Sequence, residues 1–134
     1  MFHLDQERAR HALEWVRTMA KAETASKLRM ELSGLPALIA VNGLMTVLVH
    51  GSLKSEVQQC LDDWLRNFEE PFTKVRPVEW GALDGGLLDR LHACDEATLQ
   101  RAWEESIQYA TWLKRWAAAL MPAEQSGRTD ERAA

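Results

Sequence analysis

The longest apolar stretch of the chain covers residues 35–51, LPALIAVNGLMTVLVHG, and contains neither acidic residues nor Lys or Arg. Two secondary structures are compatible with this pattern. Asn42-Gly43 between β-branched residues is a strong signal for a tight β-hairpin, whereas Pro36 suits the first turn of a helix. A lone two-stranded hairpin with two apolar faces would have no third strand to pair with. We therefore predict a buried central helix over residues 36–50.

The Asn42-Gly43 pair would lie in the middle of this central helix. A glycine there costs about 1 kcal/mol relative to alanine, so we expect it where a neighbouring helix approaches closely. Asn42 would need a hydrogen-bond partner for a buried amide. We assign a core-packing role to the residues of this motif: Leu35, Pro36, Leu38, Ile39, Asn42, Gly43 and Leu44.

The flanking segments show the periodicity of amphipathic helices. It predicts helices over residues 5–22, 26–32, 55–68, 83–92 and 96–121, with Ser33-Gly34 ending the second of them. Between residues 71 and 82 the chain contains two prolines, and we expect Phe72 and Trp80 to pin this irregular connector to the bundle.

Three of these helices have candidate N-terminal caps. Thr24 or Ser26 would cap the helix of residues 26–32. Ser55 to Gln58 reads as a capping box, and Asp95 precedes the last helix.

Together these elements predict an all-α fold, a compact single-domain bundle of roughly five to six helices. The bundle would surround the buried central helix at about residues 36–50 and include a long C-terminal helix at about residues 96–121. We expect the helical domain to cover residues 1–121 and the polar tail of residues 122–134 to be disordered.

The charge of the chain is unevenly distributed. The net charge of −4 argues against a nucleic-acid binder. However, residues 1–54 carry seven Lys/Arg against five Asp/Glu, and residues 55–134 carry nine against fifteen. Arg10, Arg17 and Lys21 form a basic stripe beside the apolar arc of the first helix. This stripe is either a solvated flank partly neutralised by Glu14 or a phosphate-contacting face.

The last helix carries a second candidate face opposite its apolar arc. Arg101, Gln108, Trp112 and Arg115 align there at spacings of seven, four and three residues. Trp112 between two arginines would either stack on a base or dock into a partner, or fold down onto the edge of the bundle. Lys114 lies at the margin of the apolar arc, where a lysine commonly snorkels.

The sequence contains no recognisable catalytic or metal-binding constellation. Its His and Cys residues, His3, His11, His50, His92, Cys60 and Cys94, lack C-x-x-C, H-x-x-H and H-E-x-x-H spacing. We expect His3 and His11 at the surface. The acidic pairs 62–63, 69–70 and 104–105 are expected on exposed helix faces, where neighbouring carboxylates point apart and cannot share a proton. We therefore expect no enzyme activity, no metal and no cofactor.

The sequence also predicts the cellular location of the protein. We expect no signal peptide, because the N-terminus lacks a charged segment followed by an apolar one. The central apolar run is too short and too polar to span a bilayer. Two cysteines without paired spacing fit a reduced, cytoplasmic setting.

Two stretches resemble a known family. LPALIAVNGL at residues 35–44, preceded by basic helices, and ATWLKRWAAAL at residues 110–120 are similar to segments of the small subunit of the type III-B CRISPR effector, the Cmr complex. The family pattern is a Lys-rich segment running into L-P-x-L-I-x-x-N-G-L, and later a W-L-K-R-F-A-like ending in which Trp116 here replaces the Phe. The resemblance spans about residues 8–120.

The resemblance implies a non-catalytic, all-α subunit in antiviral defence. Its partners would be the other Cmr effector subunits and the guide and target RNA, and its copies would stack head to tail. On this basis the RNA-facing positions are expected to be Arg10, Arg17, Lys21, Lys27, Arg29, Lys114 and Arg115.

Two other functions compete with this reading. A protein–protein adaptor without nucleic-acid contact is supported by the net acidity. A helical DNA-binding regulator would need an exposed recognition helix after the Ser33-Gly34 turn, but the apolar segment follows there.

Overall fold

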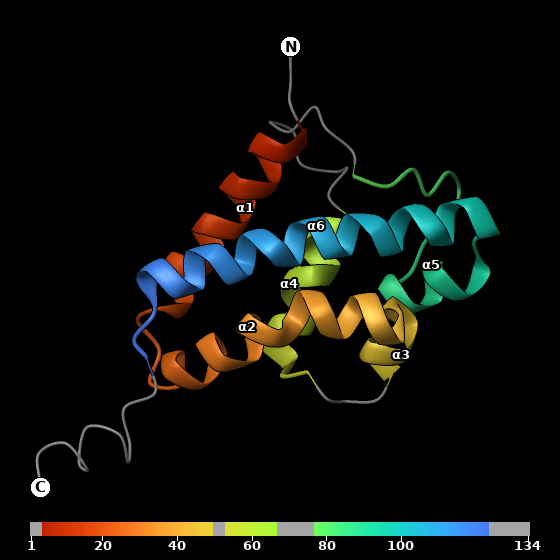
Figure 1. Cartoon of the computed structure of the whole chain (residues 1–134). Helices are drawn as coiled ribbons and strands as arrows, with labels where there is room; N and C mark the ends of the chain where they lie inside the picture. Colours follow the sequence, from red (N-terminus) through yellow and green to blue (C-terminus); the bar gives the residue numbers. More distant parts are fainter. Residues whose placement is uncertain (1–3, 50–52, 67–76, 124–134) are drawn as a thin grey trace, which may run out of the picture.

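The computed structural model describes residues 4–49, 53–66 and 77–123, and its described part contains helices and no strands (Figure 1). The predicted all-α fold with a long C-terminal helix is confirmed. The helices are α1 (Leu4–Met19), α2 (Ala25–Asn42), α3 (Leu44–Val49), α4 (Ser55–Leu65), α5 (Leu87–Ala93) and α6 (Glu96–Leu120).

Helix α6 is the element that the others share. Its 25 residues correspond to a length of roughly 37 Å, and it crosses the whole molecule (Figure 1). Helices α1, α2, α3 and α4 all contact it. The start of α6 lies beside α3 and α5, whereas its end lies beside the α1–α2 connection. The long helix, and not the apolar segment of residues 36–50, is therefore the axis of the fold.

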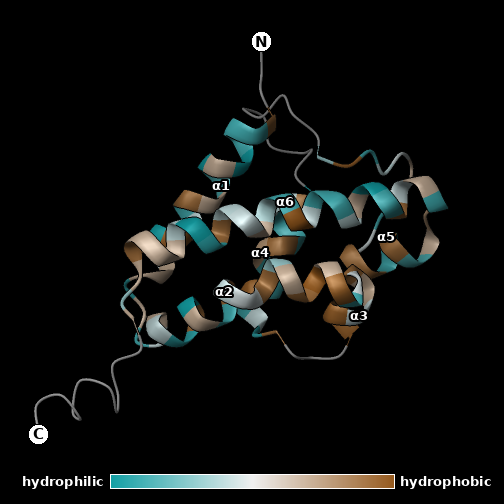
Figure 2. Ribbon diagram, viewed as in Figure 1, coloured by the Kyte–Doolittle hydropathy of each residue, from teal (hydrophilic) through white to brown (hydrophobic). Residues whose placement is uncertain are grey.

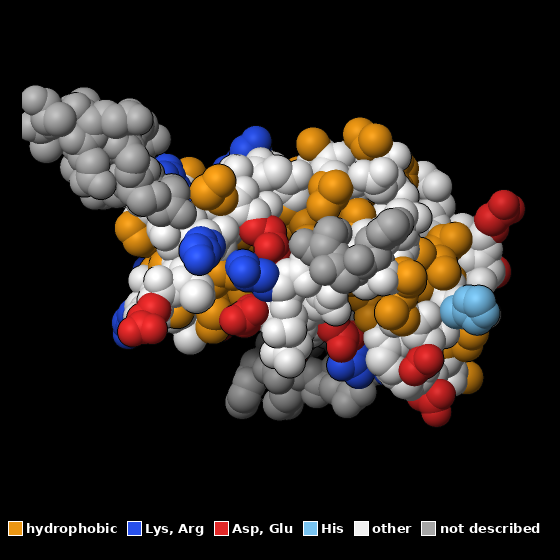
Figure 3. Space-filling view, turned by 90° about the horizontal axis from the view of Figure 1, so that it is seen from below, with side chains coloured by type: hydrophobic (Ala, Val, Ile, Leu, Met, Phe, Trp, Pro, Cys, Tyr) orange, Lys and Arg blue, Asp and Glu red, His pale blue; other side chains and the backbone are white. Residues whose placement is uncertain are grey.

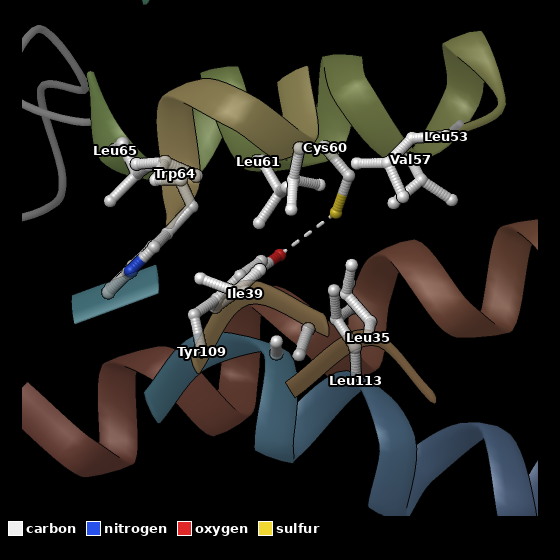
Figure 4. Packing of buried hydrophobic residues seen from close by; sticks show 14 of the residues in the cluster. Leu35, Ile39, Leu53, Val57, Cys60, Leu61, Trp64, Leu65, Tyr109 and Leu113 are labelled. Atoms are coloured by element: carbon white, nitrogen blue, oxygen red, sulfur yellow. Dashed lines mark hydrogen bonds between the residues drawn. The ribbon is translucent and has the colours of Figure 1, made fainter. Parts of the chain in front are cut away.

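The apolar core lies where α2, α4 and α6 meet (Figure 4). Leu35 and Ile39 of α2 point toward Leu61 of α4 and Leu113 of α6, and all four side chains are fully buried. Hydrophobic positions turn inward on these helices and hydrophilic ones outward (Figure 2). Leu35 and Ile39 are therefore members of the predicted motif that lie in the core.

The predicted break at Ser33-Gly34 does not occur, because α2 runs without interruption from Ala25 to Asn42 with Pro36 inside it. One continuous buried stripe explains this difference; its members are Leu28, Leu32, Leu35 and Ile39, each 0% exposed. Burying four such side chains contributes about 6–12 kcal/mol. That exceeds the roughly 4 kcal/mol by which an interior Gly and Pro disfavour a helix.

The chain breaks instead at Gly43, where the prediction placed the middle of a helix. Gly43 has φ +85° and ψ 151°, a backbone conformation that side chains disfavour. A Cβ at this position would meet nothing within 4 Å, so the expected close approach of a neighbouring helix is wrong. The left-handed φ is what requires glycine here.

The rest of the apolar segment is less buried than predicted. Asn42 is exposed, and its Nδ2 donates a hydrogen bond to the Leu38 carbonyl at 3.2 Å, so its amide is not a buried group in need of a partner. Val41 and Val49 are 81% and 67% exposed. Leu35, Ile39 and Leu44 are core residues, whereas Pro36, Leu38 and Gly43 are only partly buried.

The predicted caps have mixed outcomes. Asp95 caps α6, because its Oδ1 accepts a hydrogen bond from the Thr98 N–H at 2.8 Å. Thr24 precedes α2 without a side-chain cap bond. The Ser55 capping box is not formed, since α4 already begins at Ser55 and Lys54 occupies the N-cap position.

The connector before α5 is pinned by Trp80, as predicted. This side chain is 4% exposed, and its Nε1 donates to the Leu65 carbonyl at 2.8 Å. Phe68, Phe72 and the tail from residue 124 lie outside the described residues. Across the described ranges, no helix combines the length and the apolar character needed to cross a membrane.

Candidate nucleic-acid interface

Three of the seven predicted RNA-facing residues belong to α1 and the turn after it. Arg10 and Arg17 are exposed on the side of α1 opposite the fully buried Ala12, and Lys21 is exposed in the turn. Arg10 Nη1 lies 3.2 Å from a carboxylate oxygen of Glu7, which offsets part of its charge. Within the described part of the chain, Arg17 forms no ion pair. Arg17 and Lys21 are therefore the stronger candidates of this group.

The structure brings together Arg29 of α2 and Lys114 of α6. Both line a hollow of about 170 Å³, together with Met30, Ser33 and Ala118. Arg29 reaches across the gap, and its Nη2 donates to the Ala118 carbonyl at 3.3 Å. Two cations from different helices thus converge on one concave spot. Such an arrangement suits a phosphate group.

Arg115 belongs to a third location. Its guanidinium lies 4.9 Å from the centre of the Trp112 ring, within the range of a cation–π contact. Trp112 itself is half-buried, stacks on Trp116, and donates from Nε1 to Asp5 at 2.8 Å. Of the two alternatives for Trp112, the structure shows the one in which it folds onto the edge of the bundle.

The seven residues therefore do not form one continuous patch. Lys27 is exposed on the first turn of α2, two residues before Arg29. On the face drawn in Figure 3, Lys and Arg side chains are interspersed with Asp and Glu. The predicted interface would therefore consist of separate cationic spots on packed helices, and its role in binding stays a prediction.

A buried ion-pair network that sequence reasoning missed holds α1 against α6. Glu105 of α6 is 0% exposed and accepts hydrogen bonds from Arg8 Nε at 2.6 Å and Arg8 Nη2 at 2.8 Å. Trp64 Nε1 of α4 donates to it at 2.9 Å, and Arg101 Nη2 at 3.2 Å. Both carboxylate oxygens are thus satisfied inside the protein.

This network corrects the expectation that Glu104 and Glu105 both lie on an exposed face. Glu104 is exposed, but Glu105 lies between Ala102 and Tyr109 on the buried arc of α6. The signal was present in the sequence, because a glutamate within an apolar arc requires a buried partner. Which residue supplies that partner could not be known from the sequence.

A second polar chain links α1, α4 and α6. His11 Nδ1 lies 2.5 Å from the Tyr109 hydroxyl, and His11 Nε2 lies 2.6 Å from an Asp63 carboxylate oxygen. The Tyr109 hydroxyl lies 3.1 Å from Cys60 Sγ (Figure 4). His11 is therefore partly buried and bonded on both ring nitrogens, and its expected place at the surface is wrong.

The pKa shifts along these hydrogen-bonded side chains fit a structural role for them. The hydrogen bond from His11 lowers the pKa of Asp63, whereas burial raises the pKa of Cys60 to about 12 and raises that of Tyr109 as well. Neither Cys60 nor Tyr109 can reach a substrate, because they are 2% and 0% exposed. Over the described ranges, no group of three His, Cys, Asp or Glu residues could hold a metal ion.

Comparison with known proteins identifies the family. A family model described as CRISPR-associated protein (Cas_Cmr5) matches residues 4–120, nearly the whole described chain. No curated protein and no solved structure matches it. The match confirms the resemblance carried by the segments at residues 35–44 and 110–120. The chain belongs to the Cas_Cmr5 family and is a CRISPR-associated small subunit of the type III-B Cmr complex.

Proposed function

We propose that this protein is a non-catalytic subunit of the Cmr effector in antiviral defence and that it contacts the phosphates of target or guide RNA. Its copies would stack head to tail beside the other subunits. The observation that carries the RNA contact is the convergence of Arg29 and Lys114, from α2 and α6, on one hollow. A surface that must accept any sequence needs contacts to phosphate and sugar, not to base edges.

Rigid placement of the cations supports this proposal. Arg17 projects from a helix that is bonded to α6 through Arg8 and Glu105, and Lys114 lies on α6 itself. Cations fixed on packed helices lose less conformational entropy on binding than cations on loops. They are suited to holding a strand in a fixed register.

The experiment is RNA binding by the reconstituted Cmr complex across a range of salt concentrations. We expect Arg17→Glu with Lys21→Glu, and separately Arg29→Gln with Lys114→Gln, to weaken target-strand binding and flatten its salt dependence. Lys54→Gln is the control, because Lys54 is an exposed cation outside the predicted RNA-facing set. An unchanged salt slope in either double variant would remove that pair from the interface.

An adaptor without nucleic-acid contact is the alternative, supported by the net charge of −4 and by exposed apolar side chains at Val41 and Val49. In that case, neither double variant would change RNA binding by the assembled complex. Incorporation of the subunit into the complex, measured by co-purification, separates loss of RNA contact from loss of assembly.

A further inference from the structure

The two ends of α6 lie in regions of opposite charge. Where α6 begins, the exposed charged residues are mainly acidic: Asp84, Asp89, Asp95, Glu96 and Glu104. Where α6 ends beside the α1–α2 turn, the exposed charged residues are mainly basic: Arg17, Lys21, Lys27, Lys114 and Arg115. Figure 3 shows most of the visible Lys and Arg side chains toward one end, where acidic side chains lie among them, and mainly acidic side chains toward the other end.

The acidic end also carries an apolar hollow. The break at Gly43 turns α3 away from α2 and leaves a space of about 410 Å³, which we call the elbow hollow. Met45, Leu99 and Trp103 line this space, and Glu96 contributes a carboxylate to it. Val41 projects from the end of α2 next to this break and is 81% exposed. The hollow and the exposed valine beside it offer apolar surface to a partner.

The basic end carries exposed apolar side chains of its own. Leu120 on the last turn of α6 is 43% exposed, and Met30 of α2 is 60% exposed. Lys21 and Lys27 are exposed in the turn before α2 and on its first turn. We call these four residues the basic tip.

We propose that the basic tip of one copy docks onto the elbow hollow of the next copy. Leu120 and Met30 would cover Met45 and Val41, and the two lysines would face Glu96. The two surfaces differ and lie at opposite ends of a helix roughly 37 Å long, so the contact is heterologous and can repeat along a row of subunits. This inference rests on the proposed stacking and names the surfaces that make it.

The contact divides the predicted RNA-facing residues into two groups. Lys21 and Lys27 would be covered at each junction between copies. Met30 also lines the hollow of Arg29 and Lys114, so docking would cover that hollow as well. Arg10, Arg17 and Arg115 are not part of the basic tip and stay available to RNA. Changes at Arg10, Arg17 and Arg115 therefore test RNA contact separately from stacking.

Sedimentation velocity of the full chain at low salt, with a concentration series, tests the contact. We expect Val41→Lys and Lys27→Glu each to reduce the association constant by about tenfold or more, because each places like charges across the junction. Both changes leave folding intact: Val41 is 81% exposed near a helix C-terminus, and Lys27 lies on a first turn where an acid is favourable. An equimolar mixture of the two variants should associate again, because the unchanged tip of the Val41→Lys chain can dock onto the unchanged hollow of the Lys27→Glu chain.

Gln108→Lys is the matched control, because it adds the same charge in the middle of α6 on an exposed position. It should leave association unchanged. A wild-type chain that stays monomeric at low salt, or a mixture that does not regain association, would overturn the contact. RNA binding by the assembled complex is measured separately, so failure of the contact leaves the RNA proposal standing.

Discussion

The two helices that pack along α6 are attached to it by different kinds of contact. Helix α2 meets α6 mainly through apolar side chains, with Leu28, Leu32, Leu35 and Ile39 fully buried. Helix α1 also buries Ala12 and Val16, but it adds side-chain bonds to α6: Arg8–Glu105, Asp5–Trp112 and His11–Tyr109. Apolar burial is insensitive to pH and to partner identity, whereas a buried ion pair needs every member in place. The position of α1 should therefore depend on a few residues, and that of α2 on the sum of many.

The largest expected effect is at the buried carboxylate of the α1 contact. Glu105→Ala leaves Arg8 without its buried partner and should lower the free energy of unfolding by about 3–5 kcal/mol. Urea denaturation of the isolated chain measures this. Glu104→Ala is the matched control, because Glu104 is exposed on the same helix, and it should change stability by less than about 0.5 kcal/mol. Equal effects at both positions would contradict the buried network.

Truncation in the α2 contact should have a somewhat smaller effect. Ile39→Ala removes a fully buried side chain and should cost about 2–5 kcal/mol through lost burial and a residual cavity. Its effect should not change with pH between 5 and 8, because the burial of an apolar side chain involves no proton. Val41→Ala, at a position that is 81% exposed on the same helix, serves as the control. A strong pH dependence of the Ile39 effect would remove the contrast between the two contacts.

Acidification should weaken the contact between α1 and α4 that His11 and Asp63 form. The hydrogen bond from His11 lowers the pKa of Asp63 below its usual value, so the carboxylate stabilises the fold at pH values above the unfolded-state pKa of about 3.9. That contribution is lost as the pH falls through the lower, folded-state pKa. Asp63→Asn should therefore flatten the loss of stability in acid, as measured by thermal unfolding across pH. A variant with the wild-type acid profile would exclude this carboxylate as a source of it.

The smallest effects should come from two glycines, one inside α2 and one just after its last residue. Gly43→Ala forces a side chain into φ +85° and should destabilise the protein by about 1 kcal/mol. Gly34 lies inside α2, and a Cβ added there would have open space around it. Gly34→Ala should therefore stabilise the protein by about 0.5–1 kcal/mol. Opposite signs in thermal unfolding would confirm that α2 continues through Gly34 and ends before Gly43. Equal signs would contradict that assignment.

Much of the fold could be predicted from local patterns. The 3.6-residue periodicity located α1, α4 and α6 to within a few residues, and Asp95 marked the start of α6 because an N-cap needs only its own neighbouring N–H groups. The boundary between α2 and α3 could not be read in the same way. Gly34, Pro36 and Gly43 each favour a break, and the choice among them depends on which residues meet α6.

The candidate interface was predictable only as a set of positions. Sequence periodicity placed Arg10 and Arg17 on an exposed stripe of α1, and the structure agrees. It could not show that Arg29 and Lys114, which are 85 residues apart in the sequence, line the same hollow. Nor could it show that Trp112 would bond to Asp5 instead of facing solvent.

The sequence by itself determined the helical class of this protein, its long final helix and its membership of the Cas_Cmr5 family, because periodicity and motifs are properties of neighbouring residues. Tertiary structure alone decided that α2 passes through Pro36 and that Glu105 is buried. The physical reason is that both depend on contacts between distant segments: Glu105 is stable inside the protein only because Arg8, 97 residues earlier in the chain, reaches it.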